Sequence, residues 1–168
     1  ALDAPLPEQP FRAVGNLPYN VGTPILRRVI AQPNLRRAVF MLQKEVAQRL
    51  TAKPRDAQYG YLTLYAQMFV TARILMTLGP KSFYPAPNVD SAVVVLDPHP
   101  RTFQSDRTTL VNLISASFRM RRKKIVNNLT QWPRETVLDA LRAAGLGENA
   151  RAEEMTLDEF DRMVQALR

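Results

Sequence analysis

The sequence predicts an α/β fold in residues 1–100, followed by a small all-helical domain in residues 101–168. Short apolar, β-rich runs alternate with helical patterns in the first hundred residues, which is typical of an α/β sheet. Twelve of the thirteen prolines lie at or before Pro100. Because proline breaks helix interiors, short mixed elements should precede residue 100 and longer helices should follow it. The stretch 97–100, with two prolines, is predicted to link the two parts.

Apolar runs and helix-start signals predict the elements of the first part. Strands are predicted at 11–15, 35–42, 70–78 and 91–96, and helices at 23–31, 44–51 and 61–69. The strands at 35–42 and 91–96 have apolar centres and should be buried. Pro24 falls in the first turn of its helix, where proline is favoured.

The second part is predicted to hold four helices, at 106–118, 122–130, 134–144 and 156–167. Gly145 and Gly147 are typical of a helix stop. Thr156 and Glu159 form a capping-box pattern, which predicts the start of the last helix.

The composition excludes several classes of site. The chain has no cysteine, which excludes a disulfide scaffold, a cysteine zinc site and a thiol nucleophile. His99 is the single histidine, so we expect no metal. No apolar run approaches the roughly 20 residues of a membrane span, and no signal segment opens the chain. We therefore expect no membrane partner and a cytoplasmic location.

The net charge of +8 favours a polyanionic partner, with nucleic acid first. Residues 101–131 hold seven basic residues and one acidic residue, whereas residues 132–168 hold five basic and eight acidic residues. Five of the basic residues lie within six positions: Arg119, Arg121, Arg122, Lys123 and Lys124. Such a cluster can neutralise several phosphates. The alternative is a solvated helix end.

The strongest chemical signal is the run Gly15-Asn16-Leu17-Pro18-Tyr19-Asn20, which begins where the first strand ends. Ligands of open α/β sheets bind at the carboxyl ends of strands. The exocyclic amine of adenine is a poor nucleophile because its lone pair is delocalised into the ring. The Asn16 side-chain oxygen and the Leu17 carbonyl can accept hydrogen bonds from that amine. Pro18 has no N–H to compete, and Tyr19 can stack on a base that is unpaired or flipped out.

A second segment runs from Phe83 to Ala92 and contains Pro85 and Pro87. The prolines stiffen the loop and could hold the Phe83 ring against the other face of the same base. The alternative is a loop that packs on a core. Asp90 either pairs with a nearby base or caps a turn. For Glu45, an ion pair with Arg49 four residues on is at least as good an interpretation as a role in the site.

Together these segments resemble the ribosomal RNA small-subunit adenine dimethyltransferase family. The resemblance is carried by five further ordered matches, namely Phe40–Leu50, Tyr59–Leu62, Ser82–Val94, Phe118–Leu129 and Arg151–Leu157, and it covers nearly the whole chain. Ala152 stands where the family usually has proline.

The resemblance implies the C-terminal part of a class I, Rossmann-like methyltransferase sheet (residues 1–100) and a helical rRNA-binding domain (residues 101–168). It implies dimethylation at N6 of two adjacent adenines near the 3′ end of 16S rRNA in the 30S subunit, with S-adenosylmethionine (SAM) as methyl donor. Asn16, Leu17, Pro18, Tyr19 and Phe83 are the implied catalytic residues, and Asn16 also contacts the cofactor. The implied partners are 16S rRNA and the small ribosomal subunit, with a monomeric enzyme.

The resemblance also implies a fragment. Family members carry about another hundred residues at the N-terminus, which hold most of the SAM site, and this chain begins with Ala1 rather than methionine. We expect the isolated chain to be inactive.

Three alternatives remain open. One is a non-catalytic RNA-binding or ribosome-assembly module. Another is a macrolide-resistance type of 23S rRNA adenine methyltransferase. The third is a helix-turn-helix DNA-binding protein built from residues 103–168, against which the acidic last third argues.

Overall fold

The computed structural model describes residues 5–167, which form two compact units. The first unit comprises the residues up to Ala52 together with Tyr65–Pro100. The second comprises Lys53–Leu64 and the residues from Arg101 onward. The segment Lys53–Leu64 thus belongs to the same compact unit as the helices that follow residue 100.

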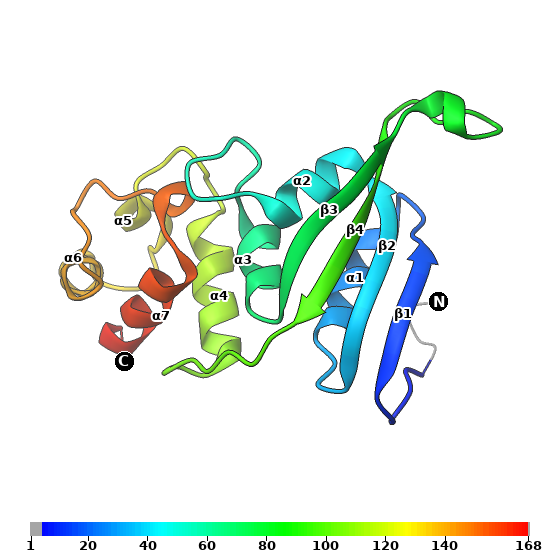
Figure 1. Ribbon diagram of the computed structural model, residues 1–168. Coiled ribbons are helices and arrows are strands. Elements are labelled where there is room, and N and C mark those ends of the chain that lie inside the picture. Colours follow the sequence, from blue (N-terminus) through cyan, green and yellow to red (C-terminus); the bar gives the residue numbers. More distant parts are fainter. Residues whose placement is uncertain (1–4, 168) are drawn as a thin grey trace. The chain divides into compact units, whose positions relative to one another are not determined.

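The first unit is built on a four-stranded sheet of β1 (Phe11–Asn16), β2 (Leu35–Gln43), β3 (Val70–Leu78) and β4 (Ser91–Pro98), in the order β1-β2-β4-β3 (Figure 1). β1 and β2 are parallel, whereas β4 runs antiparallel to both of its neighbours. The four predicted strands are confirmed to within two residues at their ends. The antiparallel position of β4 between β2 and β3 was not predicted from the sequence.

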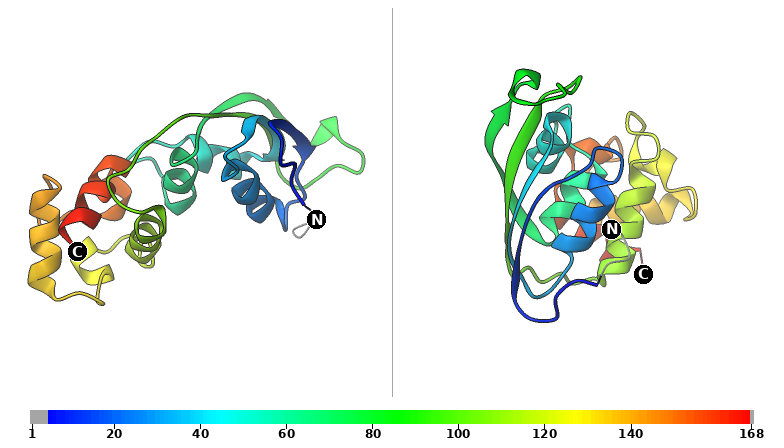
Figure 2. Two further views of the ribbon diagram at one scale, coloured as in Figure 1. Left: turned by 90° about the horizontal axis from the view of Figure 1, so that it is seen from below. Right: turned by 90° about the vertical axis from the view of Figure 1, so that its right-hand side faces the viewer.

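Two helices, α1 (Gly22–Ile30) and α2 (Lys44–Thr51), lie on the same face of this sheet (Figures 1 and 2). Apolar side chains from both layers form the core, including Leu26, Leu50 and Phe40, each at most 3 % exposed. The helix α3 (Tyr61–Gln67) begins in the second unit and ends in the first.

The topology brings three chain segments to one edge of the sheet. β1 and β2 are parallel, so their carboxyl ends meet there, with Asn16 opposite Met41. β4 runs the other way and therefore begins at this edge, where Ser91 pairs with Gln43. The loop between β3 and β4 contains the short helix η1 (Pro80–Ser82) and leads into the same edge.

The second unit contains α4 (Arg107–Ser117), α5 (Ile125–Asn128), α6 (Arg134–Ala143), the short η2 (Ala152–Glu154) and α7 (Leu157–Ala166). α7 packs against α4 and α6 and contributes Phe160 and Met163 to the core, both fully buried. The capping box of Thr156 and Glu159 is confirmed, as is the helix stop, where Gly145 has a φ of 79°.

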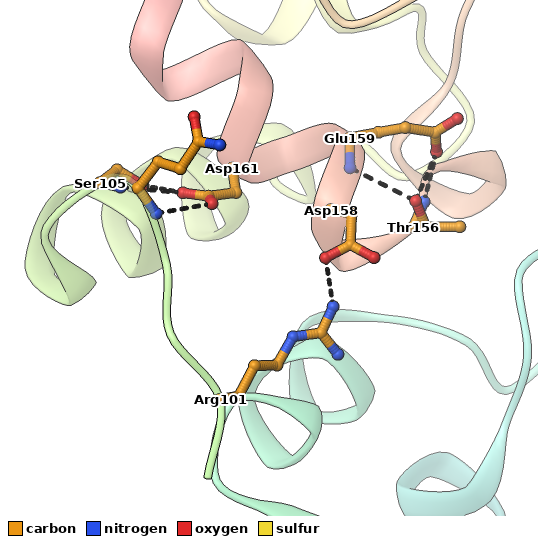
Figure 3. Close-up of polar contacts among 7 residues, drawn as sticks. Arg101, Ser105, Thr156, Asp158, Glu159 and Asp161 are labelled. Carbon is orange, nitrogen blue, oxygen red and sulfur yellow. Dashed lines mark hydrogen bonds and ion pairs between the residues drawn. The ribbon is translucent and has the colours of Figure 1, made fainter.

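A buried carboxylate ties α7 to the segment that enters α4 (Figure 3). Asp161, 9 % exposed, accepts hydrogen bonds from the backbone N–H groups of Gln104 and Ser105, at 2.9 and 3.1 Å, and from the Ser105 hydroxyl. An ion pair between Arg101 and Asp158 adds to this junction. These bonds give partners to the backbone N–H groups of the two residues just before the N-cap of α4, which lie outside the hydrogen bonds of the helix.

The segment Lys53–Leu64 is held to the second unit by polar contacts. The Tyr59 hydroxyl, at the end of a fully buried side chain, donates to the Met155 carbonyl at 2.6 Å. The Arg55 N–H donates to the Glu153 carbonyl at 2.8 Å. Burial and the nearby Glu159 carboxylate raise the pKa of Tyr59, so the hydroxyl keeps its proton for this bond.

None of the helices in residues 5–167 has the length and apolar composition that a membrane crossing requires. Within the same residues, no cluster of three or more histidine, aspartate or glutamate side chains is arranged to hold a metal ion.

Candidate functional site

The motif after β1 is fixed by backbone contacts to β2 and α1. The Leu17 N–H donates to the Met41 carbonyl at 2.9 Å, which extends the β1–β2 pairing by one residue. The Val21 N–H then bonds to the Pro18 carbonyl at 3.3 Å, and α1 begins at Gly22. A Cβ atom at Gly22 would lie 3.1 Å from the Leu17 Cβ, so glycine allows this close turn.

An open pocket of about 310 Å³ lies at this edge of the sheet, and we call it the base pocket after the stacked base that the sequence predicts here. It is lined by Asn16, Leu17, Pro18, Tyr19, Met41, Phe83, Pro85, Pro87 and Ser91. All five residues predicted for the catalytic site are therefore brought together, although Phe83 is distant in sequence from the other four. A volume of this size falls at the lower end of the range for small-molecule pockets.

Two hydrogen-bond acceptors in the base pocket are unused within residues 5–167. The Asn16 side chain and the Leu17 carbonyl oxygen make no hydrogen bond there. They belong to consecutive residues. An exocyclic amine that enters the pocket would therefore find acceptors that need not give up an internal partner first.

A long-range hydrogen bond holds Tyr19 at the pocket. Tyr19 is 46 % exposed, and its hydroxyl lies 3.1 Å from the Ser91 Oγ at the start of β4. Ser91 is only 2 % exposed. The buried serine thus fixes the hydroxyl end of a tyrosine that is partly exposed and lines the pocket.

The loop that carries Phe83 is fixed at both ends. The Phe83 N–H donates to the Pro80 carbonyl at 3.2 Å. At the other end, the Asp90 carbonyl accepts from the Lys44 N–H, and the Asp90 carboxylate pairs with the Lys44 ammonium, both at 3.0 Å. The Asp90 carboxylate is thus engaged in an ion pair with Lys44. The ion pair between Glu45 and Arg49, at 2.5 Å, is also present.

The basic cluster lies in a turn of the second unit, which we call the basic loop (residues 118–124). The predicted helix 122–130 was wrong in extent, because α5 comprises only Ile125–Asn128. The buried Asn128 side chain explains the difference: it donates to the Ser117 and Met120 carbonyls, at 2.8 and 3.2 Å, and accepts from the Met120 N–H at 3.2 Å. These bonds satisfy the backbone of a turn in place of a helix.

The five basic side chains fall into two groups. Arg121 is engaged internally, with its Nε 3.0 Å from a Glu153 carboxylate oxygen and its Nη2 3.1 Å from the Asp56 carbonyl. Lys124 donates to the Asn149 side chain at 2.5 Å. The other three, Arg119, Arg122 and Lys123, are exposed and have no side-chain partner in residues 5–167.

Sequence reasoning did not identify two residues that shape these sites, Ser91 and Asn128. Each acts through a partner that a sequence pattern does not reveal. Ser91 lies in a run that was interpreted only as a buried strand. Asn128 adjoins Asn127, and the sequence offers no signal for which of the two side chains turns inward.

Comparison with known proteins identifies the family of the chain. The family model described as "Ribosomal RNA adenine dimethylase" matches residues 3–168. A ribosomal RNA small subunit methyltransferase A from Hahella chejuensis is 40 % identical over 160 residues, and one from Myxococcus xanthus is 42 % identical over 160 residues. These alignments cover 94 % and 91 % of this chain but only 58 % and 56 % of the relatives. The chain thus spans a little over half the length of the curated relatives it matches.

Solved structures share the fold. A dimethyladenosine transferase from Plasmodium falciparum superposes with a TM-score of 0.81 at 25 % identity, over 97 % of this chain and 69 % of that one. The 23S rRNA methyltransferase ErmE superposes with a TM-score of 0.69 at 24 % identity, over 99 % of this chain and 68 % of that one. The predicted Rossmann-like methyltransferase fold is confirmed, and the chain belongs to the ribosomal RNA adenine dimethylase family.

Proposed function

We propose that this chain is the base-presenting and RNA-binding part of an enzyme that dimethylates adenine at N6 in small-subunit ribosomal RNA. The proposed substrate is the pair of adjacent adenines near the 3′ end of 16S rRNA, in the 30S subunit. The family match and the names of the curated relatives support the reaction and the subunit. The base pocket supports the role of this chain in it.

The observation that carries the proposal is that unused hydrogen-bond acceptors and aromatic side chains line the same pocket. Asn16 and Leu17 provide two acceptors that have no partner in residues 5–167, in a pocket that Tyr19 and Phe83 also line. Adenine has an amine with two hydrogens to donate and flat faces to stack. Stacking of a base on an aromatic side chain contributes about 1–3 kcal/mol.

The chain's residues would orient the amine as follows. Hydrogen bonds from N6 to the Asn16 side-chain oxygen and the Leu17 carbonyl direct both amine hydrogens toward the protein. The nitrogen lone pair is then less delocalised into the ring and faces the methyl donor. Tyr19 and Phe83 hold the ring flat between them. A base held in this way has left its stack, so the substrate is an unpaired or flipped-out adenine.

The family's methyl donor is SAM, and the described residues do not form a complete site for it. Asn16 is the one residue we assign to the cofactor side. The base pocket has no acidic side chain in its lining to bind a ribose, and no glycine-rich loop follows a strand within residues 5–167. The proposal for this chain is therefore confined to the adenine and the RNA strand.

The basic loop would bind the RNA backbone. Arg119, Arg122 and Lys123 are free to contact phosphates, and each neutralised phosphate makes binding more sensitive to salt. Arg121 is engaged with Glu153 and Asp56, so we assign it to holding the loop rather than to the RNA.

The test is ultraviolet crosslinking of the chain to unmethylated small ribosomal subunits, followed by mapping of the crosslinked nucleotides. We expect crosslinks at the adjacent adenines near the 3′ end of 16S rRNA. With Tyr19→Ala these crosslinks should be lost while salt-sensitive binding to the subunit remains. If the chain bound subunits equally well but formed no adenine crosslink sensitive to Tyr19, a non-catalytic assembly module would be the better interpretation.

A further inference from the structure

A second open pocket, of about 550 Å³, adjoins the base pocket, and we call it the amide pocket. It is lined by Gln43, Lys44, Glu45, Gln48, Asn88, Val89 and Asp90. Two backbone segments connect the two pockets directly. On β2, Met41 lines the base pocket and Gln43, two residues on, lines the amide pocket. In the segment 87–91, which leads into β4, Pro87 lines the base pocket and Asn88 the amide pocket, and at its end Asp90 lines the amide pocket and Ser91 the base pocket.

The charged groups of the amide pocket are already paired. Lys44 pairs with Asp90 at 3.0 Å, and Glu45 pairs with Arg49 at 2.5 Å. The three amide side chains, from Gln43, Gln48 and Asn88, have no hydrogen-bond partner in residues 5–167. The pocket therefore offers neutral donors and acceptors rather than a net charge, which favours the edge of a base over a free phosphate.

We propose that the amide pocket binds the base of the nucleotide next to the target adenine in the same RNA strand. The inference rests on the proposed function, because it takes the base pocket as the site of the target adenine. Two residues along a strand span about 6.6 Å, which exceeds the roughly 3.4 Å between stacked nucleotides. The pockets thus suit two consecutive nucleotides that have been separated from their stack.

The chemistry of the lining favours adenine at this neighbouring position. A glutamine or asparagine side chain pairs with the N6 and N7 atoms of adenine through one donor and one acceptor. Gln48 and Asn88 are both exposed, so their amides can reorient to meet an incoming base edge. Uridine also presents a donor and an acceptor, N3–H and O4, to such an amide, but its smaller ring stacks less well than a purine, so we expect adenine to be preferred.

The test compares two short RNAs by fluorescence anisotropy with the full chain. The first RNA is an oligouridine with one central adenine. The second RNA carries a further adenine in place of the uridine directly 5′ or directly 3′ of the central adenine, and these two versions are titrated separately. We expect wild type to bind the two-adenine RNA more tightly on one of the two sides, by about threefold to tenfold. Gln48→Ala combined with Asn88→Ala should remove this preference, so that the two-adenine RNA loses more affinity than the one-adenine RNA.

Two further variants make the result specific. Gln9→Ala removes an exposed amide from the first unit outside both pockets and should leave the preference intact. Tyr19→Ala should weaken binding of both RNAs, because it acts on the base pocket. The inference is overturned if wild type shows no preference on either side, or if the preference survives in the double variant. In both cases the proposed function still stands, provided that Tyr19→Ala weakens binding of both RNAs. If Tyr19→Ala changes neither affinity, the proposed function fails and the inference fails with it.

Discussion

The Tyr19 hydroxyl lies 3.1 Å from the Ser91 Oγ and joins two segments that are 72 residues apart in the chain. The contact connects the turn after β1 with the first residue of β4. It is available only because β4 runs antiparallel and begins where β1 and β2 end. The base pocket therefore depends on sheet topology as much as on its motif.

Ser91→Ala should uncouple Tyr19 from the sheet. We expect the free energy of unfolding to fall by about 1 kcal/mol, because a part-buried hydrogen bond is lost. A double-mutant cycle with Tyr19→Phe, measured by urea denaturation, checks this. The free energy of unfolding of the double variant should fall below that of Ser91→Ala by less than about 0.5 kcal/mol, since both changes remove the same bond. Additive losses from the two single changes would mean that the hydroxyls do not interact.

Arg121→Ala should destabilise the second unit without weakening RNA binding much. Its guanidinium connects the basic loop to Glu153 and to the Asp56 carbonyl. Because the ion pair is partly exposed, we expect a loss of about 1 kcal/mol in the free energy of unfolding.

Lys123→Ala is the matched change in the same loop, and it should do the opposite. Its side chain is exposed and without a partner in residues 5–167. Stability should stay within about 0.5 kcal/mol, while the slope of log affinity for small subunits against log salt should become shallower by about one. The assignment would be reversed if Arg121→Ala, and not Lys123→Ala, changed the salt slope.

Tyr59 should make the stability of the chain decrease in alkaline solution. Burial, with a contribution from Glu159, raises the pKa of its hydroxyl above the unfolded value of about 10. The folded state therefore holds this proton more tightly, and the stabilisation is complete below pH about 10 and lost as the pH rises above it. Urea denaturation across this range should show a smaller alkaline loss for Tyr59→Phe than for wild type.

Tyr84→Phe is the control for that experiment, because the Tyr84 side chain is fully exposed. Its alkaline loss should match that of wild type. An equal loss in wild type and Tyr59→Phe would contradict the role assigned to the buried hydroxyl.

Asp161→Ala should be among the most destabilising changes in the second unit. The buried carboxylate accepts from Gln104 and Ser105, and its removal leaves those donors without a partner. We expect a loss of about 2–4 kcal/mol in the free energy of unfolding, measured by thermal or urea denaturation. Asp139→Ala removes an exposed ion pair with Arg142 and should cost less than about 1 kcal/mol. If the two variants lost similar amounts of unfolding free energy, Asp161 would not be the residue that holds α7 to the segment before α4.

The sequence was most informative where local patterns decide structure. The strands around Phe40 and Val94 followed from continuous apolar runs, and the capping box of Thr156 fixed the start of α7. The motif from Asn16 to Tyr19 could be placed at a strand end because it follows the strand predicted at 11–15, and ligands of such sheets bind at that edge. The convergence of Phe83 on it required the family resemblance as well.

The features that could not be predicted depend on distant partners. The extent of α5 is limited by the Asn128 amide, which bonds to a turn on the other side of the basic run. The segment Lys53–Leu64 joins the second unit through Tyr59 and a partner 96 residues away. Arg121 belongs to the same basic run as Lys123, and only its contacts with Glu153 and Asp56 separate the two.

The central claim, that the base pocket binds adenine through its N6 amine, can be measured directly. The full chain is titrated with a short oligouridine RNA that carries one central adenine, and with the same RNA carrying purine, which lacks the amine, at that position. Two hydrogen bonds, from N6 to Asn16 and Leu17, predict about tenfold tighter binding of the adenine RNA, and Asn16→Ala should reduce the difference. Equal affinity for the two RNAs would contradict the claim.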